Sequence, residues 1–300
     1  MIKKLLNPLV VSAFIFVLIL GSVGHLMFGH CQTSKWHYIF QKYYVKEYLP
    51  EWLLLDLGQF VGPYPEFTGV WKSWYKYGAI ESKGEYLKES PVGQHFSWWD
   101  NGALKHSANY VKGKLEGQQI IYFDDGAKEA VFNMSNGLYV GLCKTWDKDR
   151  SYYVSNFVNG KRTGVLKGFY KNGNKKTIKN FKNSMLNGKY KTWYITGQIK
   201  VSREYLNGRE HGKYIYWDVK GNKKCEFPSL NGKWHGPSLK WYKDGALEEK
   251  TLFDHDNILS QENYFNDGTI RLKAYYDSKG NFQKREVFKK GKLIRTETTE

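Results

Sequence analysis

The stretch GKYKTWYITGQIKVSREYLNG, residues 188–208, contains the pattern that decides the fold of this 300-residue chain. Gly188 opens the stretch, Trp193 follows five positions later, and Gly197 follows four positions after that. The first half is rich in aromatic residues, and the second half alternates between apolar and polar residues up to Tyr205. Two such runs on either side of a glycine-containing turn predict a β-hairpin.

The same pattern recurs about every 24 residues from Gly69 onward. A fixed period of this length is typical of arrays of small units, none of which can bury a core alone. The opening glycines are Gly69, Gly93, Gly117, Gly141, Gly164, Gly188, Gly212 and Gly236. The aromatic residues five positions later are Trp74, Trp98, Tyr122, Trp146, Phe169, Trp193, Trp217 and Trp241, and a ninth, weaker copy retains Tyr264.

Two further positions repeat within the copies. A turn glycine follows each aromatic residue by four positions, except where Arg150 replaces it. The residue eight positions after the turn position is usually apolar: Tyr86, Tyr110, Met134, Val158, Phe181, Tyr205, Phe253 and Tyr276, with Ser229 as the exception. Asn-Gly pairs such as Asn207-Gly208 suit the tight turn that leads to the next copy. We therefore predict a mostly β protein, an elongated single antiparallel sheet of repeated hairpins of about 24 residues, with no α-helix after Gly69.

Most copies have a second aromatic residue directly after the first, as in Trp193-Tyr194. Because successive side chains of a strand point to opposite faces, we expect aromatic columns on both faces of the sheet. Asp147 and Asp218 occupy the second aromatic position in their copies and leave a polar gap in one column. That gap is either a solvated position or a notch for a basic partner.

The amino-terminal segment has the composition of a membrane span. Residues 5–24 contain no charged side chain, and residues 5–28 are long enough to cross a hydrocarbon layer of about 30 Å. Leu5, Phe14, Leu20 and Phe28 represent this predicted anchor. The alternative is a signal peptide, but no Ala-x-Ala cleavage site follows, so we favour a retained single-pass anchor. Lysines on both sides of the span leave its orientation open. The membrane is either a bacterial inner membrane or an organellar inner membrane.

An aromatic segment connects the predicted anchor to the repeats. Aromatic residues at this density beside a membrane span favour an interfacial helix, broken near Pro50, or a contact helix for a membrane partner. The predicted organisation is a transmembrane anchor or uncleaved signal over 1–30, an aromatic juxtamembrane helical segment over 31–62, the hairpin array over 63–294 and a polar tail over 295–300.

The chain is strongly basic, with a formal net charge of +17. The first 62 residues hold five lysines and three acidic residues, so most of the excess lies in the repeats. Such an array can attract acidic proteins, anionic lipid or nucleic acid. Lysine and arginine are spread through every copy, which is typical of a solvated face, and the phase of the aromatic residues favours packing over base stacking. We do not expect nucleic acid as a partner.

No pattern in the sequence predicts catalysis or a cofactor. Cys31, Cys143 and Cys225 are too few and too scattered for a disulfide framework or a zinc site. His211 and His235 share a repeat phase and could stack on adjacent hairpins, but two imidazoles without a third ligand do not predict a metal site. With no nucleophile and base at a suggestive spacing, we expect no enzyme, no cofactor and no metal.

Recurring elements between Gly69 and Gly291 resemble MORN repeats. They are Asn187-Gly188-Lys189, the stretch Asn-Gly-Lys-Trp-His-Gly over 231–236, and Phe-Tyr-Lys-Asn-Gly over 169–173. They are most similar to the bacterial variant found in YwqK-type proteins, which are named as antitoxins. The resemblance implies a scaffold for protein assembly, and in some members contact with lipid. We therefore expect a membrane-anchored, non-enzymatic scaffold that binds protein, as an accessory or assembly subunit of a membrane complex. The alternatives are a YwqK-like antitoxin that binds a toxin, and a basic face that binds anionic lipid or another polyanion.

Overall fold

The computed structural model describes residues 7–29, 34–48 and 62–299. Helical residues precede the repeats: α2 (Pro8–Phe28), α3 (Lys35–Ile39), the π-helical turn η1 (Phe40–Tyr44) and α4 (Val45–Tyr48). Among the described residues, the strands form one open antiparallel sheet of 24 strands, and no residue after Gly69 is helical. The predicted mostly β, antiparallel fold class is confirmed.

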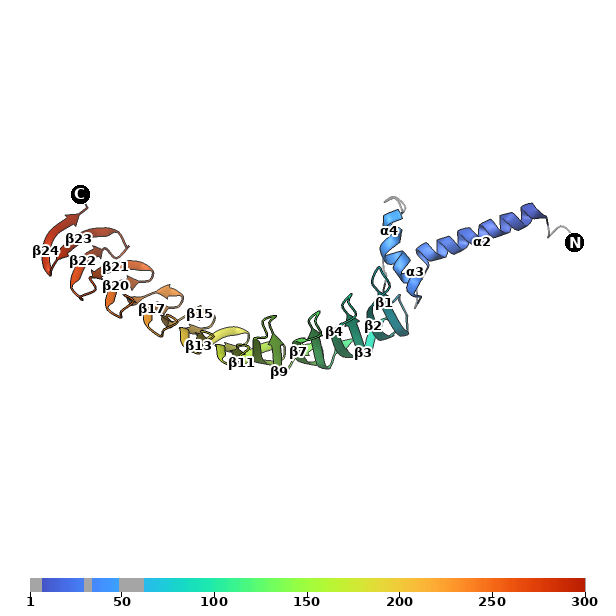
Figure 1. Ribbon diagram of the computed structural model, residues 1–300, viewed down its shortest axis with the longest axis horizontal. Coiled ribbons are helices and arrows are strands. Elements are labelled where there is room, and N and C mark those ends of the chain that lie inside the picture. The colour runs from blue at the N-terminus through green and yellow to red at the C-terminus, as the bar shows by residue number, and fades with distance from the viewer. Residues whose placement is uncertain (1–6, 30–33, 49–61, 300) are drawn as a thin grey trace. The chain divides into compact units, whose positions relative to one another are not determined.

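The strands follow one another as hairpins in chain order (Figure 1). Their bounds are β1 (Gly69–Trp74), β2 (Ile80–Leu87), β3 (Ser90–Trp98), β4 (Leu104–Val111), β5 (Lys114–Leu115), β6 (Gly117–Tyr122), β7 (Lys128–Ser135), β8 (Leu138–Tyr139), β9 (Gly141–Trp146), β10 (Tyr152–Val158), β11 (Lys161–Phe169), β12 (Lys175–Lys182), β13 (Met185–Trp193), β14 (Ile199–Leu206), β15 (Arg209–Glu210), β16 (Gly212–Trp217), β17 (Lys223–Leu230), β18 (Lys233–Trp234), β19 (Gly236–Trp241), β20 (Leu247–Asp254), β21 (Asn257–Tyr264), β22 (Ile270–Tyr276), β23 (Phe282–Lys289) and β24 (Lys292–Thr298).

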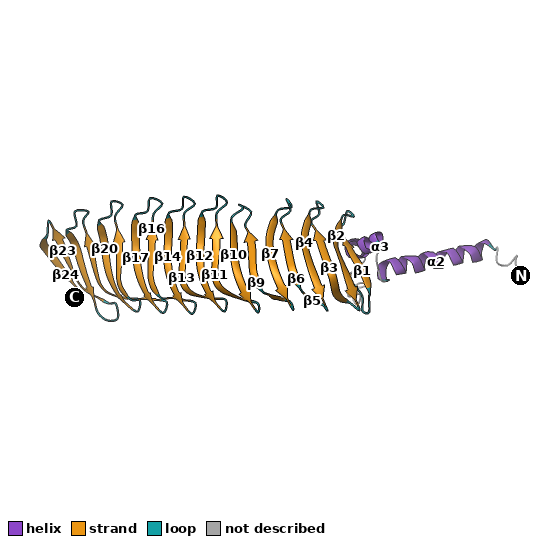
Figure 2. Ribbon diagram, turned by 90° about the horizontal axis from the view of Figure 1, so that it is seen from below, coloured by secondary structure: helices purple, strands orange, loops and turns teal. Residues whose placement is uncertain are grey.

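The chain divides into two compact units, residues 1–138 and 139–300. Unit 1 contains the helices and the hairpins up to β7, and unit 2 contains β9 to β24. Within each unit the long strands lie side by side, with turns at both ends of the strands (Figure 2). The expected polar tail at 295–300 begins inside β24, which pairs with β23 up to Thr298.

The register explains why the repeat begins with glycine. Gly93 lies opposite Tyr110 and Gly188 opposite Tyr205, so the opening glycine pairs with the aromatic residue one position before the end of the second strand. Gly93 also has a φ of +65°, a conformation that side chains with a Cβ rarely adopt. In the 24-residue copies the register shifts by one residue just before the first aromatic residue, as between Ser97 and Trp98. This irregularity is a β-bulge, and it accounts for one residue of the repeat.

The copy that starts at Gly141 is one residue shorter, and it lacks the bulge. Its strands pair without a register shift, so Gly141 lies opposite Phe157. Phe157 therefore takes the position predicted for Val158, which is 54% exposed at the end of β10. Arg150, with a φ of +67°, closes the turn where the other copies have glycine.

The second aromatic residue of each pair lies in the turn, which corrects the prediction of aromatic columns on both faces. Strand β13 ends at Trp193, and the next residue, Tyr194, donates its backbone N–H to the carbonyl of Gln198 across the turn. The alternation of faces along a strand therefore does not apply to the pair.

The segment between the predicted anchor and the repeats covers the first hairpin of unit 1. Tyr38 and Ile39 of α3 are each 2% exposed and pack with Trp71 and Trp74 of β1 and with Phe67. The sequence predicts an interfacial helix, or a contact helix for a membrane partner, in this segment. In the structure Tyr38 of this helix is buried against β1, and among the described residues no hairpin precedes β1 to cover its apolar side chains. We call this packed segment, residues 35–48, the cap; the predicted break at Pro50 lies outside the described residues.

Candidate functional site

A hollow of about 380 Å³ lies beside the cap in unit 1. Serines near one end of the strands lie between larger rings, and Ser73 Oγ lies 2.6 Å from Ser82 Oγ across β1 and β2. The volume falls within the range of sites for small ligands or single side chains of a partner. The residues that line the hollow are Tyr38, Gly62, Pro63, Trp71, Ser73, Tyr75, Glu81, Ser82, Tyr86, Ser97, Trp98 and Lys105.

An ion pair connects the cap to the wall of this hollow. Lys42 Nζ lies 2.6 Å from Glu81 Oε2, and both side chains are about one-third exposed. Burial by itself would lower the pKa of Lys42, but the hydrogen bond to Glu81 and the contacts with Tyr38 and Tyr43 together outweigh it, and the pKa lies above its ordinary value. Tyr43 adds a hydrogen bond from its hydroxyl to the carbonyl of Trp74, at 3.2 Å. The hollow therefore has a fixed wall, because the cap is attached to β1 and β2 by polar as well as apolar contacts.

In five of the copies, the second aromatic residue forms a hydrogen bond to the next hairpin. Tyr194 Oη donates to the carbonyl of Trp217 at 3.0 Å, where the first aromatic residue of the next copy ends its strand. The same bond from one copy to the next is made by Tyr75 to Trp98 and by Trp99 to Tyr122 in unit 1, and by Tyr170 to Trp193 and Tyr242 to Tyr264 in unit 2. We call this series the aromatic ladder; it stabilises adjacent hairpins against each other.

Replacing Tyr194 by phenylalanine should destabilise its hairpin by about 1 kcal/mol, because one hydrogen bond to a backbone carbonyl is lost. Burial and the neighbouring Tyr216 raise the pKa of Tyr194 to about 12, so the hydroxyl is a donor at neutral pH. Hydrogen exchange of the amides in β14 and β16 would measure the loss. Tyr77→Phe, at a side chain that is 93% exposed, is the matched control and should change nothing. Equal protection in both variants would contradict the ladder.

The chain's own groups contact both Asp147 and Asp218, the two residues at the predicted polar gap. Asp147 Oδ2 accepts from Ser151 Oγ and from Tyr153 Oη, and it lies 3.1 Å from Lys176 Nζ. Burial raises the pKa of Asp147, but these hydrogen bonds outweigh it and hold the pKa below its ordinary value. Asp218 accepts from the backbone of Lys220 and Asn222 within its turn. Asp218 therefore forms local bonds in place of the ladder bond, whereas Asp147 also pairs with Lys176 of β12 in the next copy.

A second hollow, of about 280 Å³, lies in unit 2. Phe227 and Trp234 stack at 5.4 Å along one side. Arg203 lies 4.7 Å from the centre of the Tyr214 ring and pairs with Glu210 at 2.7 Å. The lining residues are Arg203, Glu210, Tyr214, Phe227, Ser229 and Trp234. Because Arg203 and Glu210 are paired with each other, the stacked rings of Phe227 and Trp234 are the part of this hollow that is not already engaged in an ion pair.

A group of exposed basic residues in unit 2 lies at or beside the two-residue turns that lead from one copy to the next. Alternate turns of an antiparallel meander lie at the same end of the strands. We call these positions the basic edge: Lys161, Lys182, Arg209, Lys233, Lys290 and Lys292, all exposed. Lysines within the sheet are held differently, as when Lys176 lies over the Tyr153 and Tyr170 rings and beside Asp147. The basic edge is therefore one region of exposed positive charge in unit 2, and exposed lysines such as Lys189 and Lys250 lie within the strands.

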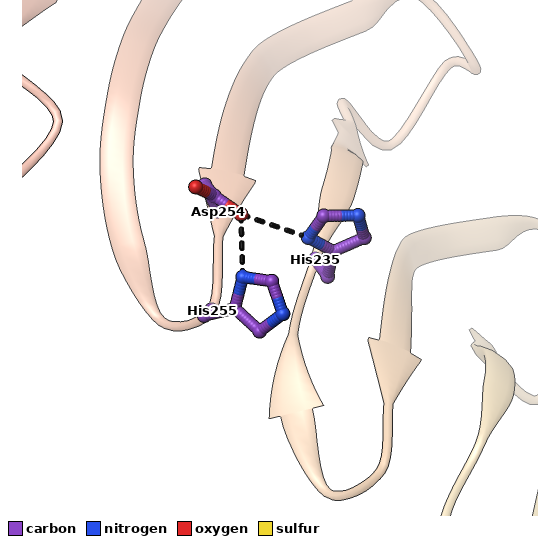
Figure 3. A group of neighbouring side chains, drawn as sticks. All are labelled: His235, Asp254 and His255. Atoms are coloured by element: carbon purple, nitrogen blue, oxygen red, sulfur yellow. Dashed lines mark hydrogen bonds and ion pairs between the residues drawn. The ribbon is translucent and has the colours of Figure 1, made fainter.

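The histidine stacking predicted from repeat phase is wrong in its partner. His235 lies beside His255, with ring centres 4.7 Å apart and the rings tilted by 51°, and the two imidazoles share the carboxylate of Asp254 (Figure 3). The repeat pattern did not predict His255 as a neighbour of His235, because His255 occupies a turn position where other copies have asparagine or lysine. These three residues are the one group among the described residues whose donor atoms could hold a metal ion together. Cys143 and Cys225 lie in separate strands, β9 and β17, and Cys31 lies outside the described residues.

The predicted anchor forms a single helix. Asn7 caps α2 by accepting the N–H of Leu9 at 3.0 Å, and Pro8 occupies the first turn. Residues 8–27 have a mean hydropathy of 2.4 and are long and apolar enough to cross a membrane, a property that signal sequences share. Phe14 is 65% and Leu20 54% exposed. Leu5 lies outside the described residues, and Phe28 ends the helix.

Comparison with known protein families matches residues 162–183 to the MORN repeat variant. The matched segment covers most of β11 and β12, including Gly164, Phe169 and Phe181, and so corresponds to one hairpin copy. The match supports the MORN-repeat character of the chain, and such repeats generally bind protein or lipid. No curated protein matches the sequence.

Proposed function

We propose that this protein is a membrane-anchored, non-enzymatic scaffold whose repeat sheet binds a protein partner, as an accessory or assembly subunit of a membrane complex. The observation that supports it most is the sequence of elements in unit 1. An apolar helix of 21 residues with exposed side chains is followed within a few residues by a cap that packs on the first hairpin. A helix in the membrane would therefore hold the hollow beside the cap close to the membrane surface.

The chemistry of the hollow fits a side chain of a partner protein. Its walls are rings, its floor is serine, and its charged groups are Glu81, already paired with Lys42, and Lys105 above the Trp99 ring. Aromatic residues with a polar atom at one end are enriched at the centres of protein interfaces. An apolar or aromatic side chain would bury these rings without leaving a charge unpaired.

The proposal can be tested by filling the hollow with a larger side chain and measuring whether the partner still co-purifies. Ser97→Trp places a ring in the space between β2 and β3, whereas Ser278→Trp adds the same ring at an exposed turn of unit 2. We expect the wild-type protein and Ser278→Trp, purified in mild detergent, to retain a stoichiometric partner that Ser97→Trp loses. Retention of the partner by all three would remove the hollow from the proposal. The identity of the partner distinguishes a membrane complex from a YwqK-like antitoxin, for which it would be a toxin.

The basic edge supports a second candidate function, the binding of anionic lipid or another polyanion. Lys182→Glu with Arg209→Glu should weaken binding of the repeat domain to anionic vesicles, by roughly fivefold or more for each cation removed. The matched control is Lys171→Glu with Lys243→Glu, which changes the net charge equally but lies in the turns at the other ends of the strands. Vesicle sedimentation at low and high salt measures the effect. Equal loss in both double variants would mean that net charge matters and the edge does not.

A further inference from the structure

Two histidines and an aspartate converge at one exposed turn of unit 2 (Figure 3). His235 Nδ1 lies 3.1 Å and His255 Nδ1 2.6 Å from the same carboxylate oxygen, Asp254 Oδ1. All three donor atoms lie within 4.8 Å of one another. The side chains are between 43% and 53% exposed, so the cluster is open to solutes.

These residues lie together because one turn departs from the sequence of the repeat. The turn between β20 and β21 is His255-Asp256, where other copies have pairs such as Asn207-Gly208. His255 has a φ of +48° and Asp256 a φ of +76°, which glycine or asparagine would adopt at lower cost. Asp256 compensates by two bonds to the preceding copy: its N–H donates to the carbonyl of Trp234, and its carboxylate accepts the N–H of Trp234 at 2.7 Å. These bonds hold His255 beside His235, the residue after Trp234.

Asp256 therefore stabilises this turn through its bonds to Trp234, whereas the turn itself does not require histidine at position 255. Asparagine would suit the first turn position at least as well as histidine. The imidazole adds only its contacts to Asp254 and His235. The hydrogen bond from His255 and, less strongly, the one from His235 lower the pKa of Asp254, so the carboxylate is ionised at neutral pH.

The donor geometry matches a tetrahedral metal site. Around a zinc ion with bonds of about 2.0–2.1 Å, donor atoms lie roughly 3.3–3.4 Å apart. The separations of 3.1 Å and 2.6 Å here require only small side-chain rotations to accept an ion. Imidazole and carboxylate together suit zinc, copper or nickel, whereas magnesium and calcium prefer oxygen ligands throughout.

We propose that His235, Asp254 and His255 bind a divalent first-row transition metal ion of the zinc class. Each imidazole binds through Nδ1, and its proton moves from Nδ1 to Nε2 as the hydrogen bond to Asp254 is replaced by the bond to the metal. Three protein ligands leave at least one position for water or for a donor atom from another molecule. The site lies at the basic edge and is independent of the hollow in unit 1.

The test titrates Zn²⁺ alone into the full chain, purified in mild detergent without a histidine tag and treated with chelator. Isothermal titration should give one equivalent of bound Zn²⁺, and Mg²⁺ should give none. Loss of a ligand should weaken binding at least as much as loss of a residue that only supports a ligand, roughly 10–100-fold. We therefore expect zinc affinity to fall by roughly 10–100-fold or more in His255→Asn and in His235→Gln. Asparagine at position 255 is suited to the turn.

His211→Gln is the matched control, because His211 has the same repeat phase as His235 but does not belong to the cluster. It should bind Zn²⁺ as the wild type does. Absence of binding to the wild type at millimolar Zn²⁺ would overturn the proposal. So would binding that His235→Gln and His255→Asn leave unchanged, because the ion would then lie elsewhere. Circular dichroism of both variants confirms that any loss of binding is not a loss of fold.

Discussion

Deleting residues 1–33 will move the protein from the membrane fraction to the soluble fraction and leave it folded. The deletion removes α2, whose 21 residues at about 1.5 Å of rise each match a hydrocarbon layer of roughly 30 Å. The exposed apolar side chains of α2, such as Leu9 at 80%, would leave water on entering lipid. Ser34, the N-cap residue of α3, is retained, so the cap can still cover β1. Fractionation with an alkaline wash measures the change.

Two outcomes would contradict this prediction. If the truncated protein stayed in washed membranes, a surface of the repeats, such as the basic edge, would be the membrane contact. If the full-length protein were soluble and mass spectrometry found it cleaved near residue 30, the segment would be a signal sequence. A second deletion, of residues 1–61, removes the cap as well as the anchor and so distinguishes their roles. We expect this variant to be soluble too, but with less protection of the amides of β1 and β2.

Trp71→Ala will destabilise the first hairpins of unit 1 by about 3–5 kcal/mol, the usual cost of removing a large buried aromatic side chain. Trp71 is 4% exposed. Its ring meets the edge of Phe67 at 5.4 Å and of Tyr38 at 6.5 Å, so it joins the cap to the sheet. Because repeat arrays can open locally, global unfolding is a poor measure of this loss. Hydrogen exchange of the amides of β1 and β2 reports it directly.

Trp36→Ala is the matched control, because it removes the same side chain from the cap at a position that is 69% exposed. We expect it to change the free energy by less than about 0.5 kcal/mol. Similar protection of β1 and β2 in the two variants would mean that the cap contributes little to the first hairpin. Loss of protection in Trp71→Ala that extends into β9 to β24 would mean that the array unfolds as one unit.

The repeat and its hairpins could be predicted because their signals are local. Glycine at a position that needs positive φ, as at Gly93, and a ring at a fixed distance, as at Trp98, are properties of a few consecutive residues. The predictions that were wrong depend on pairing between strands. Phe157 replaces Val158 because one copy lacks the bulge, and a missing residue in the sequence does not reveal which strand position is lost.

The candidate sites were much less predictable than the fold. The hollow of unit 1 needs the cap, and the sequence of residues 35–48 suits a membrane interface as well as it suits the surface of β1. The pairing of His235 with His255 needs the Asp256 bonds to Trp234, which connect residues 22 positions apart. The aromatic ladder was missed because the second aromatic residue was assigned to a strand, whereas it lies in the turn.

The sequence by itself determined the period, the hairpins, the antiparallel sheet and the apolar amino-terminal helix, since each depends on backbone preferences and hydrophobic patterning over a few residues. Only the tertiary structure decided what covers Trp71, which carbonyl each ladder residue reaches and which histidines share Asp254. These contacts join residues from different hairpins or from the cap and the sheet. They depend on the register between strands, where a shift of one residue moves a side chain to the other face.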